Sequence, residues 1–195
     1  MDAIYASKEV YHIYNRGYNK QVIFLDQQDY EAYIFRWKAV LGIIPAPLDK
    51  SGNKRFTSVP REYFDVLFYA LMPNHFHFCI RQNQDKISVS TILQPVNTSY
   101  TRYFNAKYER VGHAFQGKPR NKLITDDSYL LVLFAYIHNN PSNPESWGYS
   151  SYGHYVSGEH NELISGADIF AGLVGNPSKI KRFIADRRGQ SLDLS

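Results

Sequence analysis

Branched and aromatic residues gather in short runs bounded by polar turns, which is the pattern of β-strands. The first run is residues 10–14, and two more are residues 63–72 and 75–81. A Pro-Asn step separates the last two runs and predicts a tight turn between neighbouring strands. Residues 112–124 predict a loop that leads into a further short strand.

Apolar residues recur at spacings of three and four elsewhere in the chain, which is typical of amphipathic helices. This spacing predicts helices over residues 26–42 and 126–140, each beginning at an aspartate suited to cap it. It also predicts a helix over residues 87–103 that is interrupted or kinked at Pro95. Residues 179–188 predict a short basic helix.

The order of these elements indicates the α+β class, with an antiparallel sheet covered by helices mainly on one face. A ferredoxin-like arrangement fits this order and places the run at residues 75–81 on a central strand. Residues 45–60 contain three prolines and no apolar period, so they predict a loop insertion. Its cations Lys50, Lys54 and Arg55 fit either a solvated loop or a contact with nucleic acid.

Composition narrows the class of protein. The chain has 195 residues, of which 44% are hydrophobic and 21% charged, so we expect one folded domain rather than a disordered chain. A net charge of +4 fits a polyanionic partner but is mild for a nucleic-acid-binding protein. The 16 tyrosines can stack on bases or fill a core.

The single cysteine and the apolar segments bear on the compartment. Cys79 has no second cysteine to pair with, which excludes an internal disulfide and a Cys-rich zinc site, and we expect it to be a buried strand residue. The N-terminus lacks the pattern of a signal peptide, and no apolar stretch approaches the roughly 20 residues of a membrane span. These features predict a cytoplasmic protein that makes no membrane contact.

Two histidines are candidates for chemistry. His75 and His77 lie two apart on a predicted strand, so both imidazoles face one side of the sheet while the phenylalanines between and after them face the other. Such a pair can bind zinc, manganese, iron or nickel, or magnesium when oxygen ligands complete the shell. Paired histidines on a half-buried face are also often only hydrogen-bonded, and the pair alone leaves both interpretations open.

A tyrosine and an asparagine strengthen the metal hypothesis. Tyr136 and Asn140 lie at i and i+4 of a predicted helix and project from the same side of it. The amide oxygen can complete a coordination shell, and the phenol can attack a phosphodiester as a covalent nucleophile. A metal would polarise the phosphoryl oxygen. A tyrosine on an apolar helix is otherwise a residue at the edge of the core.

Five segments of the sequence match the motifs of one family, in the same order. They are YHIYNRG at residues 11–17, MPNHFHF at 72–78, GHAFQGK at 112–118, YLLVLFAYIHNNP at 129–141 and WGYSSY at 147–152. Through them the chain resembles the HUH-type single-tyrosine transposases, and in particular the REP-associated tyrosine transposases of the IS200-like transposase family.

The resemblance implies a ferredoxin-like transposase that cuts and rejoins single-stranded DNA bearing hairpins. It makes Tyr136 the nucleophile, which stays joined to the 5′ end of the DNA while a 3′ hydroxyl is released. It makes His75, His77 and Asn140 the ligands of Mg²⁺ or Mn²⁺. It assigns residues 1–157 to the catalytic domain and leaves residues 158–195 as a C-terminal extension of unknown role.

Basic and aromatic residues alternate between residues 101 and 122, as in proteins that bind single strands through phosphate contacts and base stacking. The candidate DNA-binding residues are Arg102, Tyr103, Lys107, Arg110, Lys118, Arg120 and Lys122. The alternative is a solvated helix whose rings lie in the core. His113, His138 and Tyr129 are further candidates near the site, for which structural roles are favoured.

Two other functions fit the same residues. A domesticated, non-catalytic DNA-binding protein would keep the fold and the basic surface, but the presence of His75, His77, Tyr136 and Asn140 argues against it. A metal hydrolase would use water as the nucleophile in place of Tyr136. Related single-tyrosine transposases work as dimers that share active sites, while the REP-associated group acts as monomers, so the resemblance leaves a homodimer open.

Overall fold

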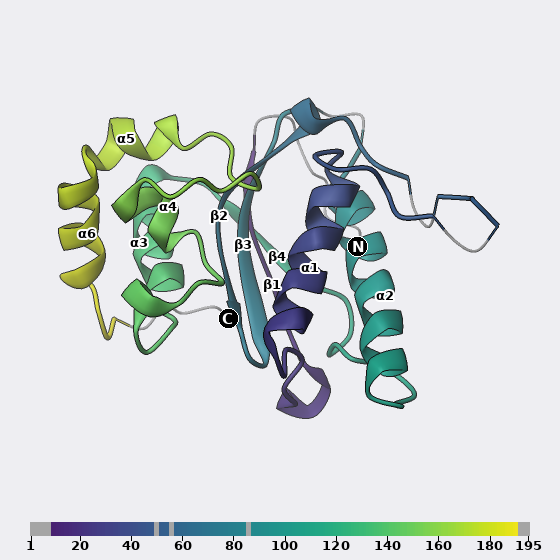
Figure 1. Cartoon of the computed structure of the whole chain (residues 1–195). Helices are drawn as coiled ribbons and strands as arrows, with labels where there is room; N and C mark the ends of the chain where they lie inside the picture. The colour runs from purple at the N-terminus through teal and green to yellow at the C-terminus, as the bar shows by residue number, and fades with distance from the viewer. Residues whose placement is uncertain (1–8, 49–50, 55–56, 85–86, 191–195) are drawn as a thin grey trace.

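The chain folds around a four-stranded antiparallel sheet, seen edge-on in Figure 1. This computed structural model describes residues 9–48, 51–54, 57–84 and 87–190. Lys50 and Arg55 of the expected basic loop therefore lie outside the described residues. None of the helices in the described part of the chain combines the length and apolar character that a membrane span requires.

The sheet has the strand order of a ferredoxin-like fold. Its strands are β1 (Val10–Arg16), β2 (Phe64–Met72), β3 (His75–Gln82) and β4 (Arg120–Ile124), in the spatial order β2-β3-β1-β4. Every neighbouring pair is antiparallel. With one helix between β1 and β2 and another between β3 and β4, the α+β class and the ferredoxin-like topology are confirmed.

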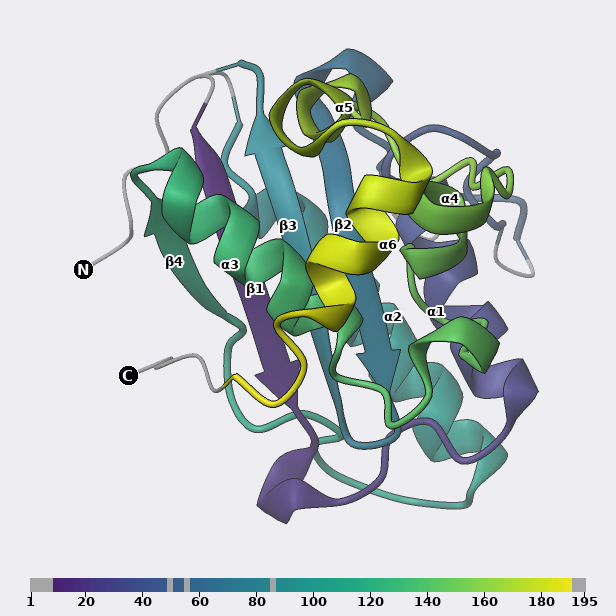
Figure 2. The same ribbon diagram turned by 90° about the vertical axis from the view of Figure 1, so that its left-hand side faces the viewer.

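Helices cover both faces of this sheet. On one face lie α1 (Gln27–Val40) and α2 (Ser90–Lys107). On the other lie α3 (Asp127–His138), α4 (Tyr152–Ser157), α5 (Asp168–Val174) and α6 (Pro177–Ala185), which Figure 2 shows in front of the strands. Three single turns of 3-10 helix complete the described elements: Tyr18–Lys20, Arg61–Tyr63 and Pro144–Ser146.

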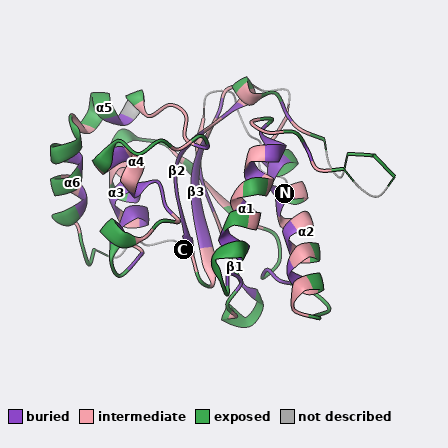
Figure 3. Ribbon diagram, in the orientation of Figure 1, coloured by how far each residue is buried: buried purple, intermediate pink, exposed green. Residues whose placement is uncertain are grey.

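The expectation of helices mainly on one face is therefore wrong. It holds for the ferredoxin-like core alone, because α3 to α6 bury the opposite face. The physical reason lies in β2, which is buried at six consecutive positions from Val66 to Leu71, so both of its faces need cover. Figure 3 shows β2 and β3 buried along most of their length, with exposed residues on the outer sides of the helices.

The two faces carry separate hydrophobic clusters. On the α1 and α2 side, Ile13, Phe76 and Phe78 pack among rings such as Trp37 and Tyr100. On the α3 side, the cluster draws on the sheet, α3 and the C-terminal helices; its members include Leu67, Phe68, Cys79, Leu133, Phe134, Phe170, Ile180 and Ile184. The C-terminal segment beyond residue 157 thus packs into the same core as the strands.

Several elements differ in detail from the expected ones. The helix expected at 87–103 is α2, which runs past Pro95 without interruption, because only one backbone N–H is lost in its second turn. Neither α4 nor α5 was expected, since both are short and lack a long apolar period. Cys79 is buried on β3, as expected.

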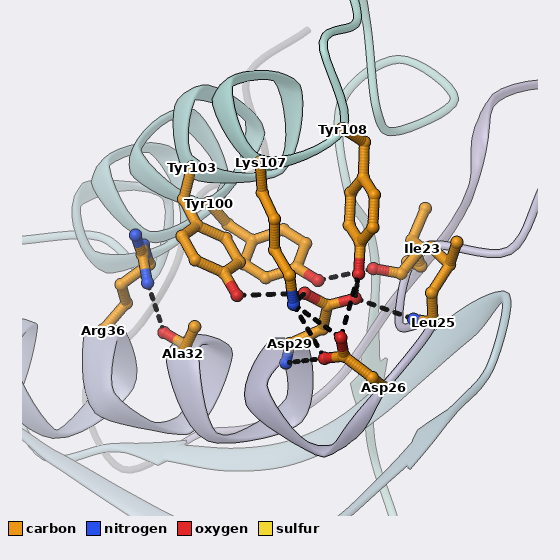
Figure 4. Close-up of polar contacts among 10 residues, drawn as sticks. All are labelled: Ile23, Leu25, Asp26, Asp29, Ala32, Arg36, Tyr100, Tyr103, Lys107 and Tyr108. Atoms are coloured by element: carbon orange, nitrogen blue, oxygen red, sulfur yellow. Dashed lines mark hydrogen bonds and ion pairs between the residues drawn. The ribbon is translucent and has the colours of Figure 1, made fainter.

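A buried carboxylate joins α1 to α2 (Figure 4). Asp29 is fully buried in the first turn of α1 and accepts hydrogen bonds from Leu25 N at 2.8 Å and Tyr103 Oη at 3.0 Å. Lys107 Nζ and Tyr108 Oη also donate to it, at 2.9 and 2.8 Å. Because each lone pair of the carboxylate meets a donor, its burial is compensated, and the two helices are fixed against each other.

Removing this carboxylate tests its structural role. Asp29→Ala removes the acceptor that Tyr103, Lys107 and Tyr108 share, so we expect the free energy of unfolding in urea to fall by about 3 kcal/mol. Glu162→Ala removes the solvent-exposed partner of Lys38 and should change the free energy of unfolding little. Similar losses in both variants would contradict this account of Asp29.

A buried histidine ties the end of α3 to β2. His138 Nδ1 lies 2.9 Å from the carbonyl oxygen of Phe134, and Nε2 lies 2.7 Å from Ser151 Oγ. Ser151 Oγ in turn accepts a hydrogen bond from Tyr69 N at 3.0 Å. Nδ1 must carry the hydrogen, since a carbonyl only accepts, so the neutral ring satisfies every partner. Burial lowers the pKa of His138 to about 3.

Acid should therefore weaken the fold through His138. In the unfolded chain His138 takes up a proton near the ordinary histidine pKa of about 6.5, whereas in the folded chain it stays neutral down to about pH 3. Stability is complete above pH 6.5 and is lost as the pH falls through this window, by about 1.4 kcal/mol per unit. Measured by urea unfolding between pH 6 and 4.5, His138→Gln should show a slope shallower by that amount. An unchanged slope in His138→Gln would contradict the assignment.

Candidate active site

The register between β1 and β3 builds the floor of the site. It places Arg16 opposite His75 and Tyr14 opposite His77. Alternate residues of a strand share a face, so all four side chains lie on the α3 side of the sheet, while Phe76 packs in the cluster on the other side. Both histidines lie on β3, which is flanked by β2 and β1.

His75 is held between two amide oxygens. Its Nε2 lies 2.9 Å from Asn140 Oδ1, and its Nδ1 lies 2.7 Å from Asn74 Oδ1. Asn140 follows the end of α3 instead of lying in its last turn as expected, but its N–H still donates to the carbonyl of Ile137 at 3.3 Å. This bond continues the helical turn, so Asn140 stays on the same side as Tyr136.

His77 is buried deeper than His75. Its Nδ1 lies 3.0 Å from Nε2 of His12, a fully buried histidine on β1. The rings of His12 and Tyr14 stack with centroids 4.8 Å apart, and His77 stacks on both. Only Nε2 of His77 is left for a ligand, because Nδ1 is occupied by His12.

Burial keeps these imidazoles neutral. It lowers the pKa of His75, against a smaller opposing effect of the hydrogen bond with Asn140. It lowers the pKa of His77 well below 6.5, and the neighbouring His12 and His75 lower it further. The pKa of His12 falls to about 3 through burial and the charge of Lys122. Neutral imidazoles are the form that binds metals.

The phenol of Tyr136 faces the same place from α3. Its ring meets His77 edge-to-face, with centroids 5.7 Å apart and an interplanar angle of 83°. Tyr136, His75 and His77 line a pocket of about 430 Å³. Tyr136 and Asn140, which helical spacing places on one side of the helix, thus both contact the histidine pair.

Cations line this pocket. Arg16, Lys20 and Arg120 line it, and no acidic residue does so among the described residues. Three loops bring them together: Gly17 N donates to the carbonyl of Asn74 at 2.8 Å, and Gln116 N donates to that of Arg16 at 2.8 Å. A pocket with three cations and no carboxylate favours a phosphate group.

The donor atoms fit a divalent cation. Nε2 of His75 and Oδ1 of Asn140 lie 2.9 Å apart, and neighbouring ligands of an octahedral ion with bonds near 2.1 Å lie about 3 Å apart. With Nε2 of His77 they give two nitrogens and one oxygen. No group of three or more His, Cys, Asp or Glu that could hold a metal occurs in the described part of the chain, so further ligands would have to come from water or substrate.

The seven candidate DNA-binding residues lie in two groups. Lys118, Arg120 and Lys122 lie at or just before β4, on the side of the site. Arg102 is exposed on α2, across the sheet from the site, and Tyr103 lies on the same helix. The structure therefore does not bring the seven residues to one surface.

Most of the second group is engaged within the protein. Tyr103 and Lys107 bind Asp29, and Arg110 donates to the side chain of Gln21. Partial burial lowers the pKa of Lys107, but its hydrogen bonds to Asp26 and Asp29 outweigh this and leave the pKa raised. Lys107 is thus a cation already paired with carboxylates.

The aromatic residues of this stretch lie mainly in the core. Tyr100, Phe104 and Phe115 are buried and belong to the cluster on the α1 and α2 side. Their faces are not available to bases. This outcome matches the alternative of a helix whose rings lie in the core.

The three further candidates lie apart from this pocket. His113 is exposed, and His138 is buried against Ser151. Tyr129 receives Lys122 over its ring at 5.1 Å. None of them lines the pocket.

Three residues of the site were missed. Arg16, Lys20 and His12 lie in or beside the motif YHIYNRG, but nothing in that motif says which strand β1 pairs with. The alternation of His12 and Arg16 with Tyr14 could have placed these two side chains on one face. Their contact with the histidine pair depends on the register of β1 on β3.

Comparisons with known proteins bear on the class of this protein. The model of the family described as "Transposase IS200 like" matches residues 48–140, a stretch that includes His75, His77, Tyr136 and Asn140. The match confirms the predicted class, a transposase of the IS200-like type. A search of the curated proteins found no match.

One solved structure shows the same fold, and a second is less similar. One is a REP-associated tyrosine transposase bound to a REP hairpin, which is 13% identical and covers 85% of this chain and 90% of its own, with a TM-score of 0.62. Another is a putative transposase from Deinococcus radiodurans R1, 9% identical over 71% of this chain and 95% of its own, with a TM-score of 0.43. At 13% identity the first likeness shows the fold alone.

Proposed function

We propose that this transposase cleaves and rejoins single-stranded, hairpin-bearing DNA with Tyr136 as the nucleophile. The observation that carries the proposal is the position of the Tyr136 phenol. It lies against His77 in a pocket that three cations line and that no described carboxylate lines, beside the donor pair of His75 and Asn140. The family match supports a reaction on DNA.

His75, His77 and Asn140 would hold a divalent ion, Mg²⁺ or Mn²⁺. When bound, this ion supplies positive charge that polarises a phosphoryl oxygen and stabilises the transition state. The chain itself keeps both imidazoles neutral by burial and keeps the Asn140 oxygen turned to His75. These groups are therefore ready to bind a cation without losing protons first.

The bond changes balance as a transesterification. The Tyr136 oxygen bonds to phosphorus, and the bond from phosphorus to the 3′ oxygen breaks. The phenol loses its proton and the 3′ oxygen gains one, which leaves a 5′-phosphotyrosine and a free 3′ hydroxyl. Arg16, Lys20 and Arg120 would stabilise the charge on the phosphate oxygens. The reverse reaction joins a strand.

The DNA strand would lie along β4. Lys118, Arg120 and Lys122 are the cations on that side of the site, so we propose them as phosphate contacts. Arg102 would meet only DNA that continues to the α2 side, and Tyr103, Lys107 and Arg110 are engaged within the protein. A hairpin partner is supported by the similar solved structure that carries one.

One chain contains the whole proposed set. His75, His77, Tyr136 and Asn140 come together within a single protein molecule. A second chain is thus not required to complete the site, and a monomer is the proposed catalytic unit.

The identity of the nucleophile is tested by trapping its covalent adduct with DNA. Labelled single-stranded hairpin DNA is incubated with Mn²⁺ and the wild type, Tyr136→Phe or Tyr129→Phe, and adducts are sought by denaturing electrophoresis and mass spectrometry. We expect a DNA adduct on Tyr136 that Tyr136→Phe abolishes and that Tyr129→Phe, on the same helix, retains. Cleavage that survives in Tyr136→Phe would make water the nucleophile. Binding without any adduct over a broad panel of hairpins would favour a non-catalytic DNA-binding protein.

The path of the strand is tested by salt dependence. Arg120→Ala should weaken binding of single-stranded DNA about tenfold and lower the slope of log affinity against log salt by about 0.7, since one phosphate contact is lost. Arg102→Ala removes an exposed arginine on the other side of the sheet and should change both values little. Equal effects in the two variants, measured by fluorescence anisotropy, would contradict the proposed path.

A further inference from the structure

The site has a third histidine that does not reach the pocket. His12 is fully buried on β1 and faces the α3 side, where its Nε2 lies 3.0 Å from Nδ1 of His77. His12 does not line the pocket, whereas its partner His77 does. We infer that His12 is a positioning residue, which holds His77 so that Nε2 of His77 faces the metal. This inference rests on the proposed metal site.

Counting hydrogens shows what the contact decides. Only one hydrogen fits between Nδ1 of His77 and Nε2 of His12. If His77 donates it, Nε2 of His77 carries a lone pair and can bind a cation. If His12 donates it, the neutral His77 carries its hydrogen on Nε2 and cannot. Metal binding therefore requires the arrangement in which His12 accepts.

The surroundings of His12 leave it suited to this role. Its Nδ1 is buried and has no hydrogen-bond partner among the described residues, so no other group fixes which nitrogen carries hydrogen. The ring can then carry its hydrogen on Nδ1 while Nε2 accepts from His77. Lys122 lies opposite His12 in the pairing of β1 with β4.

Ring packing fixes the orientation as well. The ring of Tyr14 contacts those of His12 and His77, with centroids 4.8 and 5.9 Å apart, so the three rings pack against one another on the sheet. Rotation of His77 about its side-chain bonds would break both the stack and the hydrogen bond. Histidines that bind a metal through one ring nitrogen commonly form a hydrogen bond with a protein group through the other.

Variants at residue 12 separate the hydrogen bond from the packing. His12→Phe keeps a ring for Tyr14 but removes the acceptor, whereas His12→Gln places an amide oxygen near the position of Nε2. We measure binding of Mn²⁺ to the full chain by electron paramagnetic resonance of the free ion. His12→Phe should weaken the affinity 10–100-fold, and His12→Gln should restore it to within about threefold of the wild type.

The outcomes distinguish this inference from the proposed function. His75→Ala, which removes a proposed ligand, should also lose Mn²⁺ affinity. If the wild type binds no Mn²⁺, the metal site fails and the inference fails with it. If the wild type binds and His12→Phe binds equally well, only the role of His12 is overturned.

A second measurement tests the role of His12 even if His12→Phe does not fold. Nitrogen-15 NMR of the wild type with Mg²⁺ reports which ring nitrogen of each histidine carries hydrogen. We expect His77 to carry it on Nδ1 and His12 to accept at Nε2. Hydrogen on Nε2 of His77 in the Mg²⁺-loaded protein would overturn the inference.

Discussion

The pairing of β1 with β3 is the constraint on which the site depends. Its antiparallel register sets Tyr14 opposite His77 and Arg16 opposite His75, on the face that α3 covers. A slip of one residue would turn every one of these side chains to the other face of the sheet. The stack of rings, the contact of His12 with His77 and the cation beside His75 all follow from this register.

Burial from both sides gives the site its chemistry. Because α3 and the C-terminal helices close the second face, the histidines lie in a medium that disfavours their charged forms. The same helix carries Tyr136 and ends beside Asn140, and His138 ties that end to β2 through Ser151. The position of the phenol is therefore set by packing that extends to the C-terminal segment.

The basic residues show how charge is divided between structure and function. Lys107 bonds to Asp26 and Asp29 and so helps to fix α1 against α2. Arg16, Lys20 and Arg120 instead surround a pocket that no acidic residue lines within the described part of the chain. Cations that form no ion pair with a described carboxylate keep their field for an anionic ligand, which a count of basic residues cannot reveal.

The sequence by itself determined the features that depend on local periodicity. The alternation of a strand put His75 and His77 on one face, and the helical spacing brought Tyr136 and Asn140 to one side. Tertiary structure alone decided that helices cover both faces, that His12 lies behind His77, and that Tyr103 and Lys107 serve the core. The physical reason is distance along the chain: His75 and Asn140 are 65 positions apart, as are His12 and His77, so their contacts depend on strand order and register, which no local pattern specifies.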